Sequence, residues 1–127
     1  MEINRPDVLA SLTVAFERYE RALVTNDVQE LDALFWNSPH TVRYGAGENL
    51  HGYGAIAAFR AARPGKGLDR TITSQVLTTF GDSFGTASMT FSRAGHAAIG
   101  RQSQTWVKFA EGWRVTAAHV STLKSPA

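Results

Sequence analysis

The feature that most constrains the fold of this chain is the change of pattern near residue 68. From there onward, long runs rich in β-branched and aromatic residues alternate with short turns that contain glycine. This spacing is typical of an antiparallel sheet whose strands follow one another along the chain. The expected strands are residues 68–80, 84–93, 97–109 and 113–122.

The residues before this point predict helices. Apolar side chains recur at spacings of three and four over residues 9–23, so we expect a first helix that ends near Asn26. Asn4 or Asp7 is expected to cap its N-terminus, because Pro6 suits the first turn. The buried face would consist of Leu9, Leu12, Phe16, Tyr19 and Leu23.

A second, shorter helix is expected over residues 28–34, since Asp27 and Glu30 form a capping-box pattern. A short hairpin over residues 41–51 and a third helix over residues 52–63 complete the first half. Helices followed by an antiparallel sheet predict an α+β roll. Without a linker or an internal repeat, residues 1–127 are expected to form a single domain.

Composition and motifs exclude several classes of protein. The chain has no cysteine, which excludes disulfides, thiolate nucleophiles and cysteine zinc sites. Nucleotide-binding and zinc-protease motifs are absent and the histidines show no ligand spacing, so no metal or cofactor is expected. A net charge of only +2 argues against a nucleic-acid partner. No apolar run could span a membrane and no signal peptide opens the chain, which favours a cytoplasmic protein.

The positive charge is carried mostly by arginine. Of the 13 basic residues, Lys66, Lys108 and Lys124 are the only lysines. The planar guanidinium suits bidentate recognition of carboxylates. Surface arginines encouraged by genome composition are the alternative explanation.

The last predicted hairpin brings polar side chains together. If Glu111 and Gly112 form a two-residue loop, Gln104 lies opposite His119 and Gln102 opposite Ser121. Because side chains alternate, all four then share one face with Trp106 and Ala117. On the concave face they would form either a ligand cavity or an internally satisfied network.

The opposite face is expected to be too apolar to be fully solvated, so a homodimer through this outer face is predicted. Arg101 and Arg114 would then lie at the rim of the interface. The apolar positions are Thr105, Val107, Phe109, Thr116, Ala118 and Val120.

Two further side chains are candidates for the interior. Tyr19 lies on the apolar face of the first helix, as either an ordinary core tyrosine or a ligand contact. Arg43 alternates with Val42 and Tyr44, so it is either a surface arginine or a buried one that requires an anion. His119 is likewise either a core histidine satisfied by Gln104 or part of a site.

The pattern resembles the SnoaL-like branch of the nuclear transport factor 2-like superfamily, notably in the Gly-Trp-Arg and His-x-Ser motifs of residues 104–121. This resemblance implies a curved antiparallel sheet wrapped by three N-terminal helices around a conical pocket. A narrower resemblance is to the AtzH-like family, which includes the oxalurate-catabolism relatives called HpxZ. It is carried by residues 16–23, 41–45, 48–52, 59–63 and 100–106.

The AtzH-like resemblance implies a role on small ureido carboxylates, alongside amidase-signature enzymes that degrade cyanuric-acid intermediates and oxalurate. The functional tyrosine and arginine of the family match Tyr19 and Arg43. Arg43 would bind a substrate carboxylate, Tyr19 would donate a proton or hydrogen bond, and His119 would activate water. The expected substrate-binding residues are Gln104, Ser121, Trp36 and Arg60. Arg63 is either a further carboxylate ligand beside Arg60 or, because it precedes Pro64, an exposed residue.

The sequence therefore favours a cofactor-independent hydrolase that acts on the C–N bonds of a small anionic ureido carboxylate, with decarboxylation as a possible part of turnover. Two alternatives stay open. The protein could be a non-catalytic accessory or binding protein for a partner amidase. It could also be a SnoaL-like isomerase or dehydratase, although that chemistry would require a carboxylate base.

Overall fold

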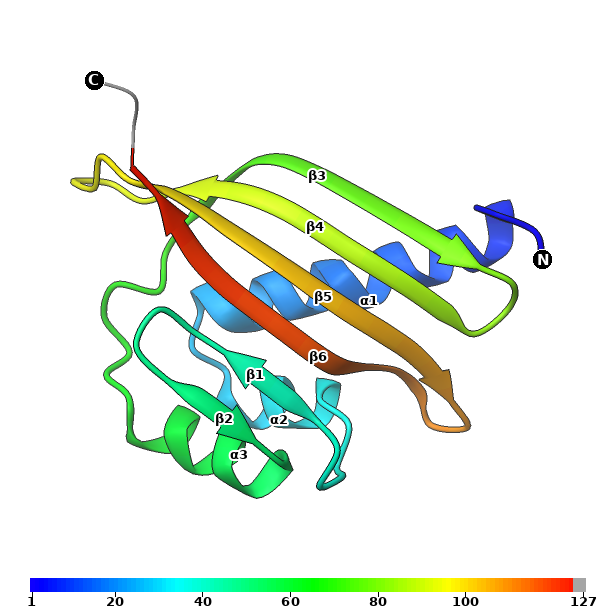
Figure 1. Cartoon of the computed structure of the whole chain (residues 1–127), viewed down its shortest axis with the longest axis horizontal. Helices are drawn as coiled ribbons and strands as arrows, with labels where there is room; N and C mark the ends of the chain where they lie inside the picture. The colour runs from blue at the N-terminus through cyan, green and yellow to red at the C-terminus, as the bar shows by residue number, and fades with distance from the viewer. Residues whose placement is uncertain (125–127) are drawn as a thin grey trace.

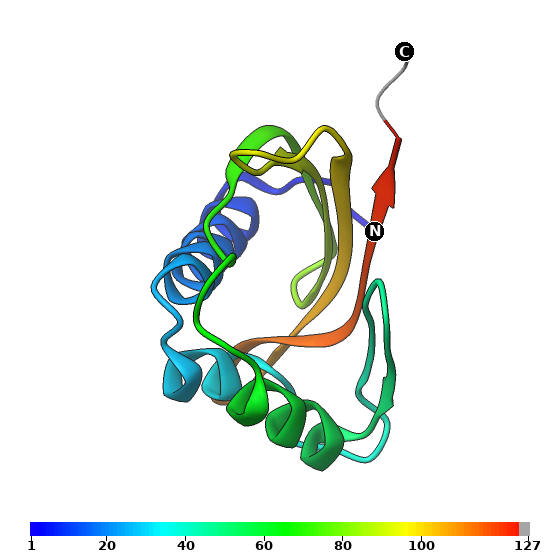
Figure 2. The same cartoon turned by 90° about the vertical axis from the view of Figure 1, so that its left-hand side faces the viewer.

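A curved six-stranded sheet forms one side of the molecule, and three helices cover its concave face (Figures 1 and 2). This computed structural model describes residues 1–124. None of the helices in that part combines the length and apolar character needed to cross a bilayer. The elements are α1 (Pro6–Val24), α2 (Val28–Leu34), β1 (Val42–Tyr44), β2 (Asn49–His51), α3 (Tyr53–Ala62), β3 (Thr71–Phe80), β4 (Phe84–Ser92), β5 (Ile99–Phe109) and β6 (Gly112–Leu123).

The sheet has the strand order β2-β1-β6-β5-β4-β3. Strands β3 to β6 form the predicted antiparallel meander. The short β1–β2 hairpin joins it through a parallel pairing of β1 with β6, which places Arg43 opposite Ala118. This non-local contact brings a residue from the first half of the chain to the concave side of the last strand.

The predicted apolar face of α1 packs against the sheet. Leu12, Phe16 and Tyr19 are each at most 3% exposed, and they share the core with Trp106 from β5. Burying an apolar side chain of this size contributes about 1.5–3 kcal/mol. The packing therefore fixes α1 across the sheet and directs Tyr19 into the interior.

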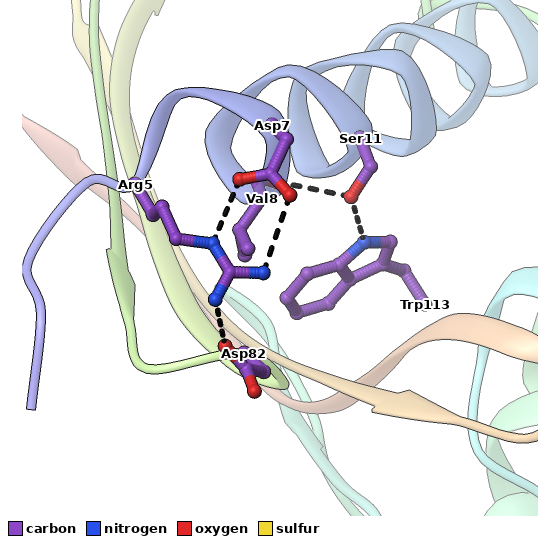
Figure 3. Close-up of polar contacts among 6 residues, drawn as sticks. All are labelled: Arg5, Asp7, Val8, Ser11, Asp82 and Trp113. Carbon is purple, nitrogen blue, oxygen red and sulfur yellow. Dashed lines mark hydrogen bonds and ion pairs between the residues drawn. The ribbon is translucent and has the colours of Figure 1, made fainter.

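The N-terminus of α1 differs from the prediction, because neither Asn4 nor Asp7 caps it. Arg5 occupies the capping position, and its guanidinium binds Asp7 and Asp82 (Figure 3). Asn4 instead accepts a hydrogen bond from the Thr79 N–H on β3. Both predicted capping side chains are thus used to attach the N-terminal segment to its surroundings.

One turn further along α1, Ser11 connects the helix to the last hairpin (Figure 3). Its hydroxyl donates to the Val8 carbonyl and accepts from Trp113 Nε1 at 2.8 Å. The helix ends as predicted, with Asn26 in the left-handed region at φ 52°. The Asp27 side chain caps α2 by accepting from the Glu30 N–H at 3.1 Å.

The last hairpin corrects the predicted register in two ways. Phe109 pairs with Gly112, so the loop consists of Ala110 and Glu111. This two-residue displacement does not change which side chains share a face, because strand side chains alternate with a period of two. A β-bulge next to Trp106 does change it, because Thr105 pairs with Ala117 while Trp106 pairs with Val115.

Beyond the bulge, β6 presents the opposite set of side chains to the interior. Gln104 pairs with Ala118 rather than His119, and Gln102 pairs with Val120 rather than Ser121. The predicted outer face therefore loses Ala118 and Val120 and gains His119 and Ser121. Val76 and Phe84, which the neighbouring strands place on this face, are 64% and 42% exposed. A homodimer through the outer face stays a prediction.

Candidate anion pocket

A small cavity of about 50 Å³ lies between the concave face of the sheet and α1, and its walls are unusually rich in arginine. Its size suits a ligand far smaller than the drug-sized molecules that fill typical protein pockets. Four guanidinium groups line it, from β1, the end of α3, the start of β3 and the end of β4. The lining consists of Tyr19, Leu23, Arg43, Arg63, Leu68, Arg70, Arg93, Gln102 and Val120.

Two of these arginines have carboxylate partners. Arg43 Nη1 lies 2.7 Å from Glu48 Oε1, on the turn between β1 and β2. Arg70 binds the Glu20 carboxylate through two of its guanidinium nitrogens. The Arg70 side chain is only 2% exposed, so its charge requires this partner.

The other two arginines have no carboxylate partner among residues 1–124. Within that same range, Arg63 Nε and Arg93 Nε are buried without any hydrogen-bond acceptor. Burial lowers the pKa of Arg63, and the neighbouring Arg43 charge lowers it further. Burial and the Arg70 charge lower the pKa of Arg93 in the same way. The pocket therefore holds positive charge that the described protein groups do not neutralise.

A neutral polar pair completes the wall. Gln102 Nε2 donates to the Tyr19 hydroxyl at 3.3 Å, while Gln102 Oε1 is buried without a partner in the described structure. The Tyr19 ring packs edge-on against Trp106, with ring centroids 6.3 Å apart. Tyr19 is therefore held rigidly, with its hydroxyl on the side of the arginines.

Phe91 supports two of the arginines. The guanidinium carbons of Arg70 and Arg93 lie 4.4 and 4.8 Å from its ring centroid, within the range of cation–π attraction. The ring lies directly over Gly100, where an added Cβ would come within 2.1 Å of it. Glycine at this position therefore allows the ring to lie against the sheet.

Of the residues predicted to act in catalysis, the structure brings Tyr19 and Arg43 together at this pocket. It does not bring His119 there. The bulge turns His119 outward, where it is exposed and packs against the Tyr44 ring at 6.0 Å. Ser121 is turned outward for the same reason.

The remaining predicted substrate-binding residues lie elsewhere. Gln104 is buried but does not line the pocket, and its Oε1 accepts from Trp106 Nε1 at 2.9 Å. Arg60 is bound to Asp32 at 2.6 Å, so its charge is already compensated. Trp36 stacks on Phe109 and lines a separate surface hollow of about 290 Å³.

Sequence reasoning missed Arg70 and Arg93 as pocket residues. A signal for both is the β3–β4 hairpin, where Thr71 pairs with Ser92 and the next positions in that register are Arg70 and Arg93. Arg63 follows α3 in an extended conformation, as expected for a residue before proline. The sequence left open whether Arg63 is a carboxylate ligand or an exposed residue, and the structure places it in the lining of the pocket.

No group of three or more histidine, cysteine, aspartate or glutamate residues that could hold a metal occurs within residues 1–124. The described pocket residues offer hydrogen-bond donors and cations rather than metal ligands. This arrangement can bind a small anion, neutralise its charge and orient it against a tyrosine hydroxyl.

Comparison with solved structures shows several proteins with the same fold. A protein of unknown function from the DUF3225 family of Pectobacterium atrosepticum is 57% identical, with a TM-score of 0.94 over 96% of this chain and 95% of that one. A cystatin-like fold protein from Burkholderia xenovorans is 45% identical, with a TM-score of 0.95 over 99% of both chains. An NTF2-like superfamily protein from Salmonella enterica shares the fold at 24% identity, with a TM-score of 0.73 over 95% and 94% of the two chains.

No curated protein matches the sequence. The family model described as AtzH-like matches residues 1–126, nearly the whole chain. The fold, with its curved sheet and three helices, agrees with the nuclear transport factor 2-like superfamily to which the neighbouring structures belong. This chain belongs to the AtzH-like family.

Proposed function

We propose that the protein binds a small ureido carboxylate in the arginine pocket and hydrolyses one of its C–N bonds. The observation that carries the proposal is the convergence of Arg63 and Arg93 on the cavity that also holds Tyr19 and Arg43. In the described structure the Nε atoms of Arg63 and Arg93 are buried without a hydrogen-bond acceptor. Uncompensated guanidinium groups in a partly dry site favour an anionic ligand. The AtzH-like family supplies the ureido class as the specific expectation.

In this proposal the pocket positions the substrate before any chemistry occurs. Arg43 keeps one guanidinium nitrogen on Glu48 and offers the rest of its donors to a substrate carboxylate. The Tyr19 hydroxyl, held between Gln102 and the aromatic core, would donate a hydrogen bond to the amide carbonyl. Fixing both ends of a planar molecule in this way lowers the entropic cost of reaching the transition state.

The proposed reaction is a hydrolysis. Water adds to the amide carbonyl carbon, the bond from that carbon to the terminal nitrogen breaks, and the products are ammonium and a new carboxylate. Negative charge develops on the carbonyl oxygen as water adds, and the surrounding guanidinium groups and the Tyr19 hydroxyl would stabilise it. Tyr19 is better suited to donate a proton to the departing nitrogen than to accept one.

The proton acceptor for water cannot be His119, which the bulge places on the outer face. Two carboxylates border the pocket through their arginine partners, Glu20 and Glu48. Glu20 is engaged by two nitrogens of Arg70, whereas Glu48 contacts one nitrogen of Arg43 and lies on a turn. Glu48 is therefore our proposed general base.

The test is to incubate the purified chain alone with a carboxylated urea and to measure ammonia release. The parent should release ammonia, while Tyr19→Phe and Arg43→Ala should reduce the rate by at least about a hundredfold, the usual contribution of a group that acts in the transition state. Glu48→Gln should abolish release but retain binding of malonate, an unreactive dicarboxylate. His119→Ala is the matched control and should release ammonia at the rate of the parent.

Ammonia release no greater than in buffer, with all variants alike, would overturn the hydrolase proposal. If malonate still binds in that case, the non-catalytic binding role becomes the better description of the pocket. A partner amidase would then be required for turnover.

A further inference from the structure

The lining of the arginine pocket is asymmetric in its hydrogen-bonding character. Its four guanidinium groups offer only donors, because arginine has no acceptor. The other polar side chains of the described lining are Tyr19 from α1 and Gln102 from β5. The pocket is therefore rich in partners for the oxygen atoms of a ligand and poor in partners for its N–H groups.

Gln102 supplies the one side-chain oxygen of the described lining that has no hydrogen-bond partner. The residue is 2% exposed, and its Nε2 donates to the Tyr19 hydroxyl at 3.3 Å. Its Oε1 is buried and accepts no hydrogen bond within residues 1–124. This orientation of the amide is electrostatically favourable, because its negative carbonyl end shares the cavity with four cations. Buried polar atoms in folded proteins are nearly always paired, so this oxygen calls for a partner that the ligand brings.

We propose that Gln102 is a specificity-determining residue whose Oε1 accepts a hydrogen bond from an amide N–H of the ligand. The carboxylate of the ligand would use the guanidinium donors, while its amide N–H would meet the single free acceptor. The pocket would then select a carboxylate that also carries an unsubstituted amide over an isostere of the same charge without an N–H. This inference rests on the proposed function of the same pocket.

Tyr19 supports this assignment, because it completes a donor–acceptor pair. Its hydroxyl accepts from Gln102, so its own hydrogen is available to a ligand. Its ring is fixed between Phe35 and Trp106, with ring centroids 6.2 and 6.3 Å away. Tyr19 and Gln102 thus hold one donor and one acceptor side by side, which match the carbonyl oxygen and the N–H of a primary amide.

Malonamate and acetoacetate are suitable probes, because they carry the same single charge and differ only in an amide NH2 group that is a methyl group in acetoacetate. The parent would hydrolyse an amide under the proposed function, so the titrations use Glu48→Gln as the reference protein. Calorimetry should show at least about tenfold tighter binding of malonamate, since only its N–H can donate to Gln102 Oε1. Adding Gln102→Met, which keeps the length of the side chain without the amide, should reduce this preference to about threefold or less.

Gln104→Met, made in the same reference protein, is the matched control. Gln104 is equally buried, lies two residues further along β5 on the same face and does not line the pocket. It should therefore leave the preference for malonamate unchanged. A purely structural role for Gln102 would weaken the binding of both probes alike, so the ratio of the two affinities separates recognition from damage to the fold. Melting temperatures measured in parallel establish that each variant is folded.

Equal affinity of the reference protein for the two probes, no binding of malonamate, or a preference that survives in folded Gln102→Met would overturn the inference. Its failure is separable from that of the proposed hydrolysis. Ammonia release by the parent without a preference for malonamate would remove only the inference. A preference that depends on Gln102, without ammonia release by the parent, would remove only the hydrolase.

Discussion

Helix α3 and the residue that follows it carry two arginines, three positions apart, with opposite surroundings. Arg60 is 3% exposed, pairs with Asp32 at 2.6 Å and lies over the Phe35 ring at 4.5 Å. Arg63 points into a cavity with three other arginines and has no carboxylate partner in the described chain. The first arrangement stabilises the fold, whereas the second stores positive charge that a ligand can neutralise.

This contrast explains why a count of arginines is a poor guide to function. A buried guanidinium that already faces a carboxylate gains little from a ligand, whatever its position. A buried guanidinium without such a partner destabilises the free protein and is relieved by an anion. The comparison is tested by substitutions that remove the carboxylate partner of a paired arginine. It is also tested by substitutions that displace the side chains packed against an unpaired arginine.

The largest effect is expected from Glu20→Gln, which converts a paired arginine into an unpaired one. Arg70 is 2% exposed, so loss of the Glu20 charge should lower the free energy of unfolding by about 3 kcal/mol. Malonate should then raise the melting temperature more in this variant than in the parent. Chemical unfolding and thermal melting with and without malonate measure both effects, and an unchanged unfolding midpoint would show that the pair is not required.

Gly100→Ala tests whether the Phe91 ring, which packs over Gly100, holds the unpaired Arg93 in place. Its Cβ would meet the Phe91 ring at 2.1 Å, and overpacking of this kind costs about 1–3 kcal/mol. Displacement of the ring should also disturb Arg93 and weaken malonate binding. Gly54→Ala on α3 is the matched control, because nothing lies within 4 Å of its added Cβ and alanine favours a helix by about 0.5–1 kcal/mol. Equal stabilities of the two variants would contradict the role of Gly100.

Arg60→Met should separate the structural arginine from the ligand-binding ones. Methionine keeps an apolar stem over Phe35 but leaves Asp32 without its cation, so the free energy of unfolding should fall by about 1–2 kcal/mol. Malonate affinity should stay as in the parent, because Arg60 does not line the pocket. A parallel loss of malonate binding would show that the two regions are coupled.

The smallest effect, with the opposite sign, is expected from Arg93→Gln in the absence of ligand. The pKa of Arg93 is lowered in the folded state, so its charged form is less favourable there than in the unfolded chain. Removing the charge should raise the free energy of unfolding, by less than about 1 kcal/mol because partial exposure screens the repulsion. A lower melting temperature than the parent would indicate that Arg93 has a stabilising role.

Much of the fold follows from local patterns. The apolar spacing that places Tyr19 in the core depends only on helical geometry, and the structure agrees with the predicted first helix and sheet meander. The predicted helix cap was wrong, because the Asn4 side chain binds the Thr79 N–H and the Asp7 side chain binds Arg5. Distant parts of the chain compete for the same polar groups, and a local rule does not include that competition.

The site was harder to predict than the fold, because one extra residue in β6 decides which side chains face the pocket. The bulge beside Trp106 adds Thr116 to β6 and so exchanges His119 for Ala118 on the concave face. A regular hairpin model assigns every later side chain to the wrong side once a single residue is inserted. His119 was therefore selected as a catalytic residue for a position that it does not occupy.

The sequence by itself determined the helices, the strands, the direction of Tyr19 and the prevalence of arginine among the basic residues, since each depends on composition or on neighbours along the chain. Only the tertiary structure decided which arginines meet, because Arg43, Arg63, Arg70 and Arg93 come from separate segments joined by strand pairing and helix packing. It also decided which of them find a carboxylate. That distinction separates a structural ion pair from a binding site, and it depends on distances that no linear pattern encodes.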